Sequence, residues 1–371
     1  MSGYQIVGIF FALLGLVSMG IVAFEWQQKR SLNLKDLPLT EKLMWIIRIT
    51  VGVLFIYSGF VKANDYIGFA YKLDEYFKVF GQHFPPLKGF FDFFIPLADP
   101  LAWFISVFEI ALAVALIVGW RMNLTAWLLM LMMVFFTVLT GYSHFTGAVT
   151  DCGCFGDALK LEPWESFVKD IILTGVLLPL FAVRKSIPPF PNDRIAGAVT
   201  GATFLISGIF SYYCHENLPV IDYRPYKVGV DLNVCTTEIT PEGYPACKDW
   251  FPYFPEAKQS FELFEGHTLM VIAYRLDKAP EAELRAASER AAKAQAAGIQ
   301  VVLATATPSA KTAEITQQVG WSYPVSLMDE TVLKTVIRSH PGYLLLDDGV
   351  IRHKWHYNNA PSVDEMQALL R

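Results

Sequence analysis

The sequence has little charge and few cysteines, and both shortages narrow what the protein can be. Only 18% of its 371 residues are Asp, Glu, Lys or Arg, whereas 53% are hydrophobic, a balance too apolar for an ordinary soluble enzyme. The net charge of −5 argues against a nucleic-acid partner. The length allows two domains, and the long apolar runs end near residue 214.

Six stretches before that point have the length and the low charge of a membrane-spanning helix, which needs about 20 apolar residues. The first is expected to remain as a span and not to act as a signal peptide, because no basic residue precedes it and Lys29 and Arg30 follow it. The predicted spans cover residues 3–24, 43–61, 101–120, 124–149, 164–183 and 195–214.

The distribution of Lys and Arg predicts the orientation of these spans, because basic residues favour cytoplasmic loops. They are densest in the loops after spans one, three and five, so the N-terminus and the part after residue 214 are expected outside. All five cysteines then fall on the outer side or at its membrane edge, where disulfides persist. The combination predicts a bacterial inner-membrane protein with a periplasmic C-terminal domain; the cysteines are Cys152, Cys154, Cys214, Cys235 and Cys247.

Two charged residues within the spans are expected to satisfy each other. Charges in the bilayer are costly and usually face the bundle interior. Arg48 could also extend to the interface, but Glu109 lies near mid-membrane. We therefore predict an ion pair between Arg48 and Glu109 that holds the bundle.

An aromatic segment separates the second and third spans. Residues 65–81 alternate aromatic and charged residues at helical spacing, and residues 83–97 add five phenylalanines and three prolines. Such residues favour the membrane interface. The segment is interpreted as an interfacial helix that caps the bundle, or as a lid over a lipid or quinone pocket.

The stretch DCGCFGD, residues 151–157, follows the fourth span. A disulfide between Cys152 and Cys154 would close a very small, strained ring, and strained disulfides are the labile ones. Three interpretations stay open: thiol exchange by this pair, a structural disulfide from this loop to Cys214, and a two-thiolate metal half-site. Lys169 and Asp170 lie about one turn below the loop and are candidate neighbours.

Three stretches resemble the DoxX/MauE-type membrane proteins. They are RITVGVLFIYSGFVKANDY (48–66), FEIALAVALIVGW (108–120), and DCGCFGD followed by FVKDIILTGVLL (167–178). The layout with an added C-terminal domain is similar to DoxX-type proteins of Bacteroidetes. The resemblance implies a four-helix membrane unit, a role in the maturation of disulfide-rich periplasmic proteins, and a kinship with thiol oxidoreductases that pass electrons to quinone.

Residues 267–371 alternate strand and helix patterns in an order that resembles a thioredoxin fold, with a hairpin turning at Asp348 and Gly349. The resemblance places Pro341 where such folds carry a cis-proline. It also places the redox CxxC within residues 274–284, which contain no cysteine. The domain is therefore expected to bind a polypeptide partner or to dock, and not to exchange dithiols itself.

The region between the last span and this domain is rich in proline and aromatic residues and holds Cys235 and Cys247, which are expected to form a local disulfide. The predicted divisions are residues 1–41, 42–186, 187–214, 215–266 and 267–371. The leading hypothesis is a membrane protein that assists thiol–disulfide handling of exported proteins. The alternatives are a structural or assembly subunit of an envelope complex, and a lipid- or quinone-binding protein. No residue is assigned as a metal ligand, and quinone is the one candidate cofactor.

Overall fold

The computed structural model describes residues 3–149, 153, 155–235, 253–254, 259–260 and 265–371. The chain divides into two compact units between Tyr212 and Tyr213. The first unit is helical, and the second is built around a mixed β-sheet. A membrane all-α part followed by an α/β part is the fold class that the sequence predicts.

Six helices of the described chain are long and apolar enough to cross a membrane, which confirms the six predicted spans. Helices α2 and α5, α6 and α7, and α1 and α7 pack together most extensively. The helices are α1 (Gly3–Lys29), α2 (Pro38–Asn64), α5 (Ala98–Val118), α6 (Met122–Thr146), α7 (Pro163–Val183) and α8 (Asp193–Asn217).

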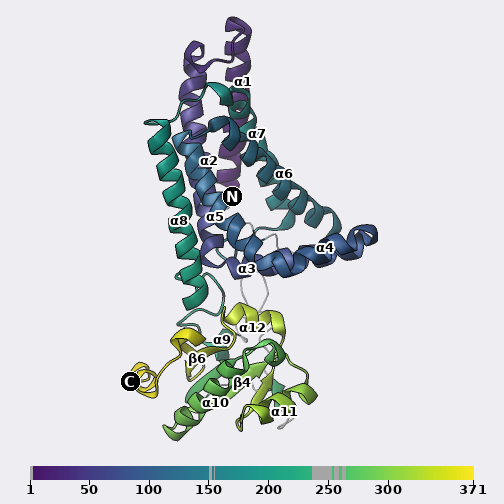
Figure 1. Ribbon diagram of the computed structural model, residues 1–371, viewed down its shortest axis with the longest axis vertical. Coiled ribbons are helices and arrows are strands. Elements are labelled where there is room, and N and C mark those ends of the chain that lie inside the picture. Colours follow the sequence, from purple (N-terminus) through teal and green to yellow (C-terminus); the bar gives the residue numbers. More distant parts are fainter. Residues whose placement is uncertain (1–2, 150–152, 154, 236–252, 255–258, 261–264) are drawn as a thin grey trace. The chain divides into compact units, whose positions relative to one another are not determined.

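The aromatic segment forms two further helices, α3 (Tyr66–His83) and α4 (Lys88–Phe94). Figure 1 shows them running across the direction of the long helices. Helix α3 is amphipathic as predicted, because it buries Phe69, Leu73 and Tyr76 at helical spacing. On α4, in contrast, Phe90 and Phe93 are exposed.

The second unit holds a sheet with strand order β2-β1-β5-β4-β3-β6-β7. Strands β3, β4 and β5 are parallel, whereas β6 and β7 are antiparallel. The strands are β1 (Tyr253–Phe254), β2 (Gln259–Ser260), β3 (His267–Ile272), β4 (Gln300–Thr305), β5 (Val325–Leu327), β6 (Gly342–Asp347) and β7 (Val350–His356).

Both faces of this sheet are covered, because alternate residues of a strand point to opposite faces. On β3, Met270 and Ile272 join one apolar cluster with α12, and Leu269 and Val271 join another with α10 and α13. The helices are α10 (Glu281–Ala296), α11 (Ser309–Gln318), α12 (Glu330–Val336) and α13 (Val363–Leu369). The bond between His340 and Pro341 is cis, as expected.

The described residues of the region predicted as a linker are packed against the sheet. Gly229 N donates to Ile351 O, and Ile351 N donates to Val230 O. The short helix α9 (Leu232–Cys235) follows directly. Residues 229–232 therefore continue the sheet beyond the outer side of β7, which the weak periodicity of the sequence did not indicate.

Candidate functional site

A glycine contact between α2 and α5 decides which charges meet inside the membrane unit. A Cβ added at Gly59 would lie 2.7 Å from Ile110 Cγ1, so the two helices come closer there than a larger residue would permit. Lys62 lies about one turn beyond Gly59 on α2, and Glu109 directly precedes Ile110 on α5. The close crossing therefore brings Lys62 and Glu109 together.

Lys62 and Glu109 form a buried ion pair, with 2.9 Å between Nζ and Oε2. Lys62 also donates to Ser58 Oγ at 2.6 Å, and its ammonium lies 5.9 and 5.7 Å from the ring centroids of Phe69 and Phe136. Opposite charge and aromatic faces both stabilise a cation that has left water. From the described part of the chain, Glu109 Oε2 accepts no aligned hydrogen bond, so attraction between the charges holds it.

The predicted pair between Arg48 and Glu109 is wrong. Arg48 Nε donates to Leu116 O at 2.9 Å, and Nη2 donates to Ile117 O. These carbonyls belong to the last turn of α5, where the regular N–H partners of a following turn are missing, although Leu116 O also accepts from Gly119 N. Glu109 lies two helical turns from that end, roughly 10 Å away, so Arg48 instead caps the helix that carries Glu109.

A second glycine contact joins α6 to α7 and positions Asp170. A Cβ at Gly141 would lie 2.9 Å from Phe167 Cε2. The neighbouring Thr140 donates to Asp170 Oδ2 at 3.0 Å. Lys169 Nζ lies 2.7 Å from Asp170 Oδ1. The sequence predicts Lys169 and Asp170 as charged neighbours of the CxC loop. It does not identify Thr140 as a partner, because Thr140 belongs to another helix.

The two ion pairs line one small cavity of about 20 Å³, enough for about one water molecule. Its walls also include Ser58, Phe136 and Phe155. Two lysines and two carboxylates in one intramembrane space mark a functional-site candidate. Their opposite charges could transfer a proton between paired groups or balance the charge of a neighbouring group.

Cys152 and Cys154 lie outside the described residues, but Gly153 and Phe155 are described. Gly153 has φ +66°, and a Cβ there would lie 3.2 Å from Lys72 Cγ. Phe155 lines the cavity, and Lys169 Nζ lies 5.3 Å from its ring centroid. Gly153 therefore contacts Lys72, and Phe155 forms part of the wall of the charged cavity.

The other cysteine predictions remain untested. Cys214 is buried near the end of α8 and belongs to the second unit. Cys235 ends α9, whereas Cys247 lies outside the described residues, as do the two loop cysteines of the proposed exchange or metal sites. Within the ranges that are described, no three His, Cys, Asp or Glu side chains come together as a metal site.

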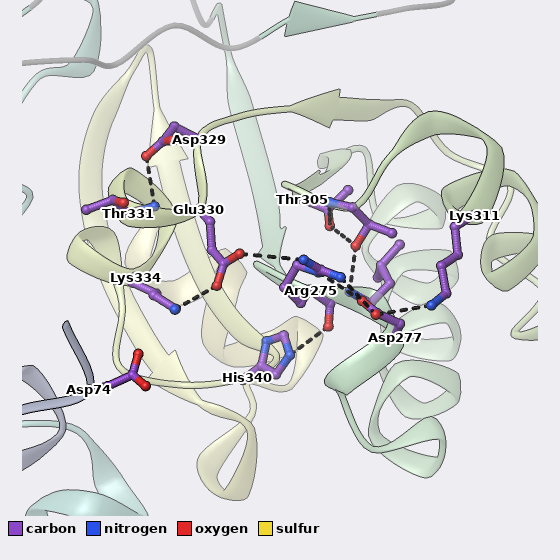
Figure 2. A network of polar contacts seen from close by, with 12 residues as sticks. Asp74, Arg275, Asp277, Thr305, Lys311, Asp329, Glu330, Thr331, Lys334 and His340 are labelled. Atoms are coloured by element: carbon purple, nitrogen blue, oxygen red, sulfur yellow. Dashed lines mark hydrogen bonds and ion pairs between the residues drawn. The ribbon is translucent and has the colours of Figure 1, made fainter. Parts of the chain in front are cut away.

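The second unit has a polar network where the thioredoxin resemblance would place a CxxC (Figure 2). Arg275 binds Asp277 with two hydrogen bonds of 3.0 and 2.9 Å, and Lys311 adds a third at 3.1 Å. The hydrogen bonds from Arg275 hold the pKa of Asp277 well below its usual range. Glu330 Oε2 lies 3.8 Å from Arg275 Nη1, and Glu330 Oε1 lies 2.7 Å from Lys334 Nζ.

His340 directly precedes the cis-proline before β6, and its side chain joins this network. Its Nε2 lies 2.8 Å from Arg275 O, and its ring stacks on Tyr274 with 3.7 Å between centroids. Burial lowers the pKa of His340 to about 4. The neutral ring therefore donates through Nε2, which leaves Nδ1 as an acceptor. This network can position a ligand, but residues 274–284 have no thiol for redox chemistry.

These features define a membrane protein with six apolar helices, an intramembrane charge cluster and a smaller α/β unit. Residues 40–183 match the family model described as Methylamine utilisation protein MauE. The matched segment contains both ion pairs, the cavity and the CxC motif. No curated protein and no solved structure matches the chain.

Proposed function

We propose that this protein assists thiol–disulfide handling or maturation of exported proteins, with Cys152 and Cys154 as the reacting pair. The observation that carries the proposal is the position of two described residues of this motif: Gly153 packs on Lys72, and Phe155 lines the charged cavity. A lysine close to a thiol favours the thiolate, which is the reactive form. The MauE match over residues 40–183 supports the maturation part of the proposal.

The reaction is an exchange between two cysteine pairs. Two thiols of an exported protein reduce the Cys152–Cys154 disulfide, lose two electrons and two protons, and form their own disulfide. The resulting dithiol is reoxidised by a membrane quinone, which takes up two electrons and two protons to give the quinol. Lys62, Glu109, Lys169 and Asp170 would hold or move protons at the buried end of this site.

The second unit serves as the binding module in this proposal. The strand order β4-β3-β6-β7 and the cis bond before Pro341 support a thioredoxin-like fold. The charged network of Arg275, Asp277 and Glu330 would contact a polypeptide partner. We also propose that the chain has the layout of DoxX-type proteins and lies in a bacterial inner membrane. Its N-terminus and its second unit would then be in the periplasm.

Mass-spectrometric mapping of thiols and disulfides in intact membranes tests the reaction. We expect Cys152 and Cys154 to change between dithiol and disulfide when reductant or quinone supply changes. A Cys152→Ser/Cys154→Ser variant should leave exported dithiols reduced, whereas the matched control Cys235→Ser/Cys247→Ser should not. A pair fixed in one state under all conditions, or unchanged exported-protein oxidation in the first variant, would contradict the proposal.

A structural or assembly subunit of an envelope complex is the second candidate. It is favoured by the absence of a cysteine between β3 and α10 and by the mutual neutralisation of the buried charges. In that case the Cys152→Ser/Cys154→Ser variant retains exported-protein oxidation, and removal of the whole chain instead lowers the amount of an assembled membrane complex. A lipid- or quinone-binding role without thiol chemistry would leave both readouts unchanged.

A further inference from the structure

An apolar groove runs between α1 and α7, away from the charged cavity. Its space is about 440 Å³, within the range of small-molecule sites. The described residues that line it all have apolar or aromatic side chains; among them are Met19, Ala23 and Trp26 from α1 and Leu178, Pro179 and Ala182 from α7.

The groove arises from a change in helix spacing and side-chain size. Near the middle of the helices, a Cβ at Gly15 would lie 3.2 Å from Val176 Cγ2, so α1 and α7 are close. Farther along both helices, Ala23 and Ala182 have short side chains and leave space between the backbones. Trp26 and Leu32 are exposed at its border, so the groove opens on the outer surface of the bundle.

Basic residues surround the end of this groove where α1 and α7 stop. Lys29 ends α1, Arg30 lies 5.3 Å from the Trp26 ring centroid, and both are exposed. Leu34 N donates to Ser186 Oγ at 3.2 Å, so the loop after α1 meets the turn after α7. That turn carries the exposed Lys185.

Two acidic residues at this end, Glu25 and Asp36, accept hydrogen bonds from neighbouring neutral groups. Glu25 accepts hydrogen bonds from Leu39 N and Thr40 N at the start of α2, at 3.1 and 2.9 Å. Asp36 accepts one from Ser31 Oγ at 2.9 Å. Lys29, Arg30 and Lys185, here called the basic collar, outnumber these two carboxylates, so they leave a net positive charge beside the apolar groove.

We propose that this groove and the basic collar bind one anionic phospholipid. A hydrocarbon chain lies between α1 and α7 against Ala23 and Ala182, and the phosphate lies at the basic collar. The combination matches both ends of such a lipid, since basic pockets between membrane helices attract anionic headgroups. A zwitterionic lipid gains the same apolar contacts but less from the collar. The site is independent of the cysteine chemistry proposed above.

Native mass spectrometry of the full chain in mild detergent tests the site, with dioleoyl-phosphatidylglycerol and dioleoyl-phosphatidylcholine as probes. We expect the wild-type chain to retain the anionic lipid at least tenfold more strongly. A Lys29→Gln/Arg30→Gln/Lys185→Gln variant should lose that preference. The matched control Arg194→Gln, an exposed residue in the first turn of α8, should keep it.

Filling the groove tests the chain position separately. Ala23→Phe and Ala182→Phe should each weaken retention of the anionic lipid at least fivefold, whereas Ala202→Phe, on an exposed part of α8, should not. Equal retention of the two lipids by the wild-type chain would overturn the proposal. So would an equal loss in the collar variant and in Arg194→Gln, or unchanged retention in both groove-filling variants.

Discussion

Two buried lysines, one in each unit, are stabilised in different ways. Lys62 in the membrane unit lies 2.9 Å from Glu109, and Lys354 on β7 lies 2.8 Å from Asp222. Both side chains are nearly inaccessible. Glu109 has Lys62 as its ion-pair partner, whereas Asp222 also binds the buried Arg224 at 2.7 Å. The two ion-pair distances are therefore similar, but the surrounding charges differ, because Asp222 has a second cation beside it.

The two sites differ in the charges that remain when the lysine becomes neutral. Burial, reinforced by the charge of Arg224, lowers the pKa of Lys354 from 10.5 to about 7, although Asp222 opposes this shift. Burial would raise the pKa of Asp222, but Arg224 and Lys354 outweigh it and hold that pKa below its usual value. Lys354 can thus become neutral while Asp222 keeps a counter-charge. Glu109 has no second cation among its described contacts.

The largest effect should follow removal of the membrane lysine. Lys62→Met leaves the Glu109 carboxylate buried without its partner, so we expect a loss of about 3–5 kcal/mol in the free energy of unfolding. The double variant Lys62→Met/Glu109→Leu should recover most of this loss, because it leaves neither member of this pair as an unpaired buried charge. Unfolding in mixed detergent micelles measures both.

Lys78→Met is the control for Lys62→Met, because Lys78 belongs to an exposed pair with Asp74 and should cost less than about 1 kcal/mol. If Lys62→Met changed the free energy of unfolding no more than this control, the pair would not stabilise the membrane unit.

Removal of the outer lysine should cost less. Lys354→Met leaves Asp222 paired with Arg224 but deprives Val336 O of a 2.7 Å hydrogen bond, so we expect a loss of about 1–3 kcal/mol. Pulse proteolysis of the second unit across a urea series measures it. Lys311→Met, at an exposed pair with Asp277, is the control. A loss as large as that of Lys62→Met would remove the distinction between the two lysines.

The sequence predicts the elements on which these lysines lie better than the contacts they make. Apolar runs set by bilayer thickness predict α2 and α5. Short continuous apolar runs predict β3, β4 and β6, and the turn at Asp348 and Gly349 predicts the β6–β7 hairpin. The pairing of Lys62 with Glu109 depends on how α2 is rotated toward α5 at Gly59. Nothing in a single helical pattern specifies that rotation, and Arg48 was an equally charged alternative.

The same limit applies to the second unit. The short strands β1, β2 and β5 have two or three residues each, too few to show a period of two. Asp222 and Arg224 lie in a segment without periodicity, and their roles come from packing against Lys354. Ser58 and Lys62 are four residues apart on a span that also holds Gly59, a pattern that indicates a polar contact with another helix. The pattern does not identify the residue that Lys62 contacts on that helix.

The pH dependence of stability separates the two lysines further. Between pH 7 and 9.5 the unfolded chain keeps a proton on Lys354 that the folded chain has released, so the unfolded state binds more protons. The free energy of unfolding of the second unit should therefore rise with pH, by at most about 1.4 kcal/mol per pH unit. Lys354→Met should flatten this rise in the same proteolysis assay. An identical slope in the variant would assign the proton to another group.

The smallest effect should appear at Asp170, the other carboxylate of the membrane cavity. Thr140→Val removes the 3.0 Å hydrogen bond to Asp170 Oδ2 but keeps Lys169 at 2.7 Å, so we expect a loss of about 1 kcal/mol. Thr137→Val is the matched control, because Thr137 donates to Met133 O within its own helix. Thermal unfolding in one detergent compares the two variants. Because Asp170 keeps its cation, a cost that approached that of Lys62→Met would mean that Thr140, and not Lys169, is the main partner of this carboxylate.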